Sequence, residues 1–129
     1  MRILLIEDDA LLADGLARAL RHSGYVVDLA DNGKLADAML AENSYELAIL
    51  DLGLPGLDGT EVLQRLRSRR QPTPVLVLSA RLAVEELRRR CHDVASASFV
   101  GRDDVLGWMR DRLAHPPRTV VIAGGGGLG

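Results

Sequence analysis

Two stretches of the chain decide its predicted fold: residues 1–9 read MRILLIEDD and residues 47–55 read LAILDLGLP. In each stretch a short apolar run ends abruptly at carboxylates, which are Glu7 and Asp8 in the first and Asp51 in the second. Apolar runs of four to eight residues are typical of strands that are buried on both faces. Because such strands occur in parallel sheets covered by helices, the two stretches predict an α/β protein.

The rest of the chain alternates between strand-like runs and segments with helical spacing. Further strand-like runs occur at 25–29, 75–78 and 98–100, and helical spacing occurs at 10–22, 34–41, 60–69, 82–91 and 103–113, with Thr60 as the expected cap of the third helix. This order predicts a doubly wound, five-stranded parallel sheet with helices on both faces and ligands at the carboxyl ends of its strands. We assign residues 1–115 to this domain and residues 116–129 to a Pro/Gly-rich tail with a short strand-like segment.

The composition narrows the classes of function. Of the 129 residues, 47% are hydrophobic, and the formal charge of −2 supplies no basic field for direct nucleic-acid binding. Cys91 is the single cysteine, which excludes an internal disulfide and is typical of a reducing compartment. No apolar run approaches the roughly 20 residues that a membrane span needs, and the early carboxylates are not typical of a signal peptide. We therefore expect a cytoplasmic protein that does not contact the membrane.

The acidic residues that follow the first and third strands are the strongest chemical signal. Adjacent parallel strands would bring Glu7, Asp8 and Asp51 to one edge of the sheet. Two carboxylates about 5 Å apart repel by about 3 kcal/mol at an effective dielectric of 20, and Mg²⁺ would relieve that repulsion. A carboxylate beside Mg²⁺ can attack phosphorus and form an acyl phosphate. In the alternative interpretation Asp8 and Asp9 only cap the first helix, which leaves Asp51 unexplained.

Three stretches carry a resemblance to a known family: residues 1–9, residues 50–59 (LDLGLPGLDG) and residues 74–81 (PVLVLSAR). They resemble the CheY-like receiver domains of response regulators, and most closely those of the OmpR/PhoB-type transcription regulators, near the PmrA/QseB branch. The resemblance implies the flavodoxin/CheY-like fold and a phosphoacceptor regulatory domain of a two-component system. Such a domain is not an enzyme beyond self-catalysed phosphotransfer and dephosphorylation.

The resemblance also implies roles for individual residues. Asp51 is the phosphoacceptor, and Asp8 is a ligand of Mg²⁺. Glu7 holds the metal through water, and Gly53 offers its backbone carbonyl. Ser79 is the hydroxyl that turns toward the phosphoryl group when the domain switches. The implied partner is a sensor histidine kinase. The implied output is transcription in this branch. The resemblance implies that this output is controlled through the fourth and fifth helices and the fifth strand, which are also the expected surface of a homodimer.

The last third of the chain departs from the family pattern. Counted without gaps, the family's Lys-Pro pair falls on Gly101 and Arg102, and its switch aromatic falls on Ser98. A pseudo-receiver that binds a protein partner without phosphorylation therefore remains an alternative. The run at 124–129 matches G-x-G-x-x-G after a strand-like segment, which leaves open an N-terminal piece of a nucleotide-binding α/β enzyme, although the pattern is nearly automatic in a run of glycines.

Overall fold

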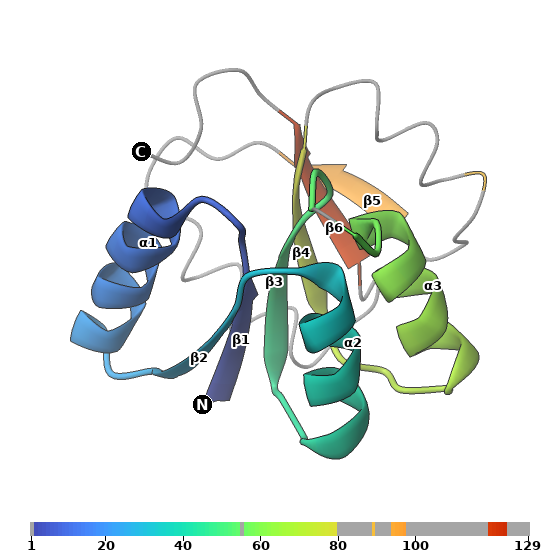
Figure 1. The fold of residues 1–129 in the computed structure, drawn as a ribbon, viewed down its shortest axis with the longest axis horizontal. Helices are drawn as coiled ribbons and strands as arrows, with labels where there is room; N and C mark the ends of the chain where they lie inside the picture. The colour runs from blue at the N-terminus through green and yellow to red at the C-terminus, as the bar shows by residue number, and fades with distance from the viewer. Residues whose placement is uncertain (1, 55, 80–88, 90–93, 98–118, 124–129) are drawn as a thin grey trace.

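A computed structural model describes residues 2–54, 56–79, 89, 94–97 and 119–123 of the chain (Figure 1). Strands and helices alternate through the first four strands. The elements are β1 (Arg2–Ile6), α1 (Ala10–His22), β2 (Val26–Ala30), α2 (Gly33–Glu42), β3 (Leu47–Asp51), α3 (Gly59–Ser68), β4 (Val75–Ser79), β5 (Val94–Ala97) and β6 (Thr119–Ala123).

All of these strands belong to one parallel sheet, in the order β2-β1-β3-β4-β6-β5. The predicted fold class is confirmed, because the sheet is parallel and α1, α2 and α3 join its first four strands. Among the described residues the sheet has six strands, one more than the five that the sequence predicts. The strand-like segment of the predicted tail is β6, and it pairs with β4 inside the sheet (Figure 1).

Helices cover both faces of the sheet, because successive side chains of a strand point to opposite faces. In β1, Ile3 and Leu5 pack with the apolar side of α1, whereas Leu4 and Ile6 pack with α2 and α3. The first core also takes Ala13, Ala17 and Leu20 from α1, and the second takes Ala36, Leu40, Val62, Leu63 and Leu66 from α2 and α3. In Figure 1, α1 accordingly lies on one side of the strands and α2 and α3 on the other.

Each described helix begins at a side chain that accepts backbone N–H groups of its first turn. Asp9 caps α1, Asn32 caps α2 and Asp58 caps α3. The prediction that Thr60 caps the third helix is wrong, because the Asp58 carboxylate accepts the Thr60 N–H at 2.8 Å and the helix begins at Gly59. Asp is among the strongest N-cap residues, because its short side chain places a carboxylate oxygen within reach of the free N–H groups of the first turn.

Several predicted elements lie outside the described residues. These are the strand at 98–100, the helix at 103–113 and most of the helix at 82–91, of which Arg89 alone is described and is helical. The boundary that we placed between residues 115 and 116 lies there as well, and it stays a prediction. Among the described helices, none combines the length and the apolar character required to cross a bilayer.

Candidate metal centre at the carboxyl edge of the sheet

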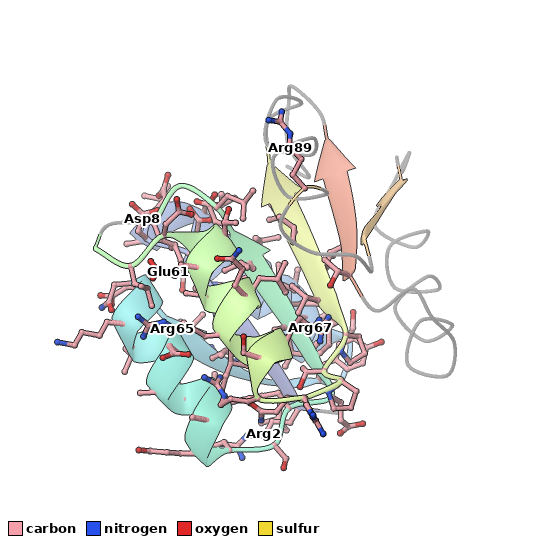
Figure 2. All side chains as sticks on the ribbon, turned by 90° about the vertical axis from the view of Figure 1, so that its right-hand side faces the viewer. Arg2, Asp8, Glu61, Arg65, Arg67 and Arg89 are labelled. Atoms are coloured by element: carbon pink, nitrogen blue, oxygen red, sulfur yellow. The ribbon has the colours of Figure 1, made fainter. Side chains whose placement is uncertain are left out.

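Three acidic side chains converge where β1 and β3 end. The two strands are neighbours, with Ile6 opposite Leu50, so Glu7 and Asp8 directly follow β1 beside Asp51 at the end of β3. One carboxylate oxygen from each of Glu7, Asp8 and Asp51 lies within 4.8 Å of the other two. Figure 2 shows Asp8 at the end of the molecule toward which the strands point. The grouping that the sequence predicted is therefore present.

Glu7 is the buried member of this group, with 5% of its surface exposed. Burial raises the pKa of its carboxyl from 4.5 to about 7, and the hydrogen bond and negative charge of Asp51 act in the same direction. The Asp9 N–H, which donates to Glu7 Oε1 at 3.2 Å, lowers the pKa again but does not cancel the rise. The pKa of Glu7 is therefore raised mainly by its burial and in addition by its contact with the neighbouring Asp51 carboxylate.

Asp51 is partly exposed, and its orientation is fixed by the backbone that follows it. Its Oδ1 accepts the N–H of Gly53 at 3.1 Å, which is an Asx-type turn at the end of β3. The N–H of Gly53 therefore points at the Asp51 carboxylate. The role that the resemblance gives to the Gly53 carbonyl, as a metal ligand, stays a prediction.

The two acidic residues after Glu7 have different roles. Asp9 Oδ1 accepts the N–H groups of Leu11 and Leu12 at 3.0 and 3.2 Å, so Asp9 is the cap of α1. Asp8 is exposed and belongs to the carboxylate group instead. The alternative that both residues only cap the helix therefore holds for Asp9 and fails for Asp8.

Ser79 is the last residue of β4, which lies beside β3. Leu78 is the partner of Asp51, so the backbone of Ser79 stands one residue further along the same edge of the sheet. The backbone of Ser79 therefore lies near the end of β3 that carries Asp51. The role of the Ser79 hydroxyl stays a prediction. Ser98, Gly101 and Arg102 lie outside the described residues.

Two glycines pack closely against the chain that follows β3, and the contact of one of them, Gly33, was not predicted from the sequence. A Cβ on Gly33, the first residue of α2, would stand 1.9 Å from the carbonyl oxygen of Leu57. A Cβ on Gly59 would stand 2.6 Å from the carbonyl oxygen of Asp51. Gly33 was not singled out from the sequence, where its only signal is its place directly after Asn32, the cap of α2.

The model of the response regulator receiver domain family matches residues 3–101 of this chain. The chain belongs to this family. A receiver domain of a two-component system is a regulatory domain rather than an enzyme of the ordinary kind, and the match includes the whole acidic group. The resemblance found in the sequence is thereby confirmed.

Similar receiver-containing proteins are transcriptional regulators. The chain is 46% identical over 106 residues to the transcriptional regulatory protein TctD of Salmonella typhimurium, covering 82% of this chain and 44% of that protein. It is 45% identical over 106 residues to PmrA of Pectobacterium parmentieri, covering 82% and 45%, and 50% identical over 86 residues to QseB of Haemophilus influenzae, covering 67% and 39%. This receiver chain thus spans less than half the length of these curated relatives.

Solved receiver domains share the fold. The receiver domain of the sensor histidine kinase PA1611 of Pseudomonas aeruginosa has a TM-score of 0.72 at 25% identity, covers 88% of this chain and 98% of its own, and is described with a magnesium ion coordinated in its active-site cleft. A putative response regulator of Chloroflexus aurantiacus has a TM-score of 0.73 at 24% identity, with 88% and 98% covered, and bears on the fold alone.

Proposed function

We propose that Asp51 accepts a phosphoryl group while Asp8, Asp51 and the Gly53 carbonyl hold Mg²⁺, with Glu7 acting on the metal through water. The observation that carries this proposal is the convergence of the three carboxylates within 4.8 Å at the carboxyl edge of the sheet. The donors suit Mg²⁺, which prefers hard oxygen ligands and keeps several waters. The charges of Asp51 and Asp8, which add to the effect of burial in raising the pKa of Glu7, are consistent with the same assignment.

Phosphoryl transfer would use few groups of the chain. A carboxylate oxygen of Asp51 forms the new bond to phosphorus, the bond from phosphorus to the donor breaks, and the electron pair leaves with the donor. The Gly53 N–H, which is bonded to Asp51 Oδ1, holds the carboxylate in position for this attack. The Ser79 hydroxyl then donates to an oxygen of the bound phosphoryl group. When bound, Mg²⁺ supplies positive charge against the charge that develops on the phosphoryl oxygens.

The partner and output extend beyond this chain. The donor is a sensor histidine kinase or a small phosphodonor in the cytoplasm, and the output is control of transcription, because the curated relatives are transcriptional regulators of more than twice the matched length. We assign the surface for homodimerisation to the fourth and fifth helices and the fifth strand. Direct nucleic-acid binding is not assigned to residues 1–129.

Phosphorylation with acetyl phosphate and Mg²⁺, followed by intact mass measurement, tests the proposal. The wild-type chain should gain one phosphoryl group and should gain none when Mg²⁺ is replaced by a chelator. Asp51→Asn, which is nearly isosteric, should gain none under either condition. Asp14→Asn is the matched control, because Asp14 lies on exposed α1 and pairs with Arg18 outside the acidic group.

The same experiment separates the receiver from a binding-only pseudo-receiver. A folded wild-type chain that stays unlabelled with Mg²⁺ would support the pseudo-receiver. Label that survives in Asp51→Asn would place the acceptor at another residue, and Asp9 would then be examined next because it follows Asp8 directly.

A further inference from the structure

The C-terminal strands are out of chain order in the sheet. β4 pairs with β6, and β5, which comes between them in the chain, pairs with the far side of β6 (Figure 1). Consecutive strands joined by a crossover are usually neighbours, and the CheY-type order places the fifth strand beside the fourth. The family model ends its match at residue 101, so β6 (Thr119–Ala123) comes from the part of the chain beyond that match.

β4 and β5 meet β6 in the same register. Leu78 of β4 and Ala97 of β5 are both partners of Ile122, and Val75 and Val94 are both partners of Thr119. All three strands run parallel. If β6 left the sheet, β5 could therefore pair with β4 by moving sideways through one strand spacing, without sliding or turning.

The lengths of the connections permit both arrangements. Fourteen residues (80–93) join β4 to β5, and twenty-one residues (98–118) join β5 to β6. A crossover between parallel strands needs about a dozen residues or more. The chain can thus place either β5 or β6 next to β4.

One side chain fastens β6 at its first residue. Arg67, in the last turn of α3, donates from Nη2 to Thr119 Oγ1 at 2.7 Å and from Nη1 to the carbonyls of Gln71 and Thr73 at 2.9 and 2.8 Å. Thr119 is 1% exposed, so this bond lies inside the protein. Figure 2 shows Arg67 at the end of the sheet opposite to Asp8. The bond joins β6 to the helix and loop that precede β4.

We propose that Thr119–Ala123 is an exchangeable strand, which occupies the edge of β4 in the structure and is replaced there by β5 when it leaves. Exchange moves β5 by about 4.8 Å toward β4 and Ser79. It thereby changes which residues border the candidate metal centre on the side of β4. The arrangement with β6 in the sheet is the more stable one, because β6 forms ladders with both β4 and β5. When β6 leaves, both ladders are lost and only one, between β4 and β5, can form in their place. The proposal does not depend on phosphorylation of Asp51.

Disulfide trapping in the full chain tests the exchange. In a Cys91→Ser background, Leu78→Cys is combined either with Ile122→Cys or with Ala97→Cys. Neighbouring strands bring paired Cα atoms to about 4.8 Å, inside the range that a disulfide spans, whereas two spacings of about 10 Å exceed it. Leu78 is only partly buried, so an added oxidant can reach it. The 78–122 pair should therefore cross-link readily and the 78–97 pair at least tenfold more slowly.

Release of β6 should invert these rates. Val121→Pro removes a backbone donor from the middle of β6 and is not accommodated between two strands. In that variant the 78–97 cross-link should form at least tenfold faster than in the parent chain, and the 78–122 cross-link should slow. Val121→Thr, which keeps the donor and the β-branch, is the matched control and should behave as the parent.

Two results would overturn the proposal. One is a parent chain in which the 78–97 pair cross-links as fast as the 78–122 pair. The other is a cooperatively folded Val121→Pro variant that loses the 78–122 cross-link and gains no 78–97 cross-link. If Val121→Pro does not fold, Thr119→Val decides, because it removes only the hydroxyl that Arg67 binds. That variant should raise the 78–97 rate severalfold, and an unchanged rate would reject the exchange.

Discussion

Residues 2–79 and the strands β5 and β6 differ in how closely they follow the expectations from sequence. In the first region β1, β3 and β4 stand in the order that short right-handed crossovers give, and the acidic residues meet at the predicted edge. In the second region, a strand from the predicted tail stands where the fifth strand was expected. An apolar run indicates that a strand forms, but its neighbours are decided by competition among all the strands of the sheet.

The composition of the two C-terminal strands accounts for the outcome of this competition. β6 reads TVVIA and β5 reads VASA. A strand between two others is buried more completely and favours β-branched apolar residues, which β6 has in greater number. The weaker sequence of β5 suits the outer position.

The first prediction concerns pH and the first region. The pKa of Glu7 is about 7 in the folded protein and 4.5 for the ordinary carboxyl, so the folded state binds more protons than the unfolded state between these pH values. Without Mg²⁺, the free energy of unfolding should therefore fall by about 3 kcal/mol as the pH rises from 4.5 to 7, and then level off. Urea unfolding at pH 5 and pH 8 measures the difference.

Glu7→Gln is the test variant for this dependence of stability on pH. Glu42→Gln is its control, because Glu42 is an exposed residue at the end of α2. Glu7→Gln should remove most of the loss of stability toward pH 7, while Glu42→Gln should retain it. An equal dependence in both variants would show that the loss of stability toward pH 7 comes from another group than Glu7.

The second prediction concerns the loop that follows β3 and Asp51. Gly33→Ala places a Cβ 1.9 Å from the Leu57 carbonyl oxygen, so the loop or α2 must shift, at a cost of about 1–3 kcal/mol in stability. Gly15→Ala is the matched control, because Gly15 lies in α1 with nothing within 4 Å of the added Cβ. That change should stabilise the protein by about 0.5–1 kcal/mol. Thermal or urea unfolding of both variants decides, and two changes of the same sign would contradict the packing described for this loop.

The third prediction concerns the second region. Thr119→Val deletes the hydroxyl that accepts from Arg67 and keeps the shape of the side chain, so the free energy of unfolding should fall by about 1 kcal/mol. Urea unfolding at pH 7.5 measures the loss. An unchanged free energy of unfolding would mean that the hydrogen bond at the start of β6 adds no stability to the sheet. The first region would then be stable independently of the second, which would be only loosely attached.

Much of the first region was predictable because its signals are local. The bounds of α1 were predicted at both ends, since Asp9 caps it and the apolar residues repeat at helical spacing up to His22. The meeting of Glu7, Asp8 and Asp51 was predictable as well, because adjacent parallel strands must bring their carboxyl ends to one edge. The cap of α3 was missed because Asp58 and Thr60 are both good caps, and only the packing of Gly59 against the Asp51 backbone decides between them.

The position of β6 could not be derived in the same way. Pro116 and Pro117 and the later glycines indicate a tail, so the strand-like segment between them was not expected to join the sheet. Contacts over long sequence separations decide its place, among them the bond from Arg67 to Thr119. A pattern within a short window cannot contain both partners of such a contact pair.

The central claim is that Glu7, Asp8 and Asp51 form one metal site, and a Mg²⁺ titration followed by thermal melting tests it most directly. Binding to the folded state alone raises the melting temperature with metal concentration. The wild-type chain and the control Asp14→Asn should both show this rise in millimolar Mg²⁺, and Asp8→Asn should lose most of it. A wild-type melting temperature that is indifferent to Mg²⁺, or an Asp8→Asn variant that responds as the wild type does, would contradict the account.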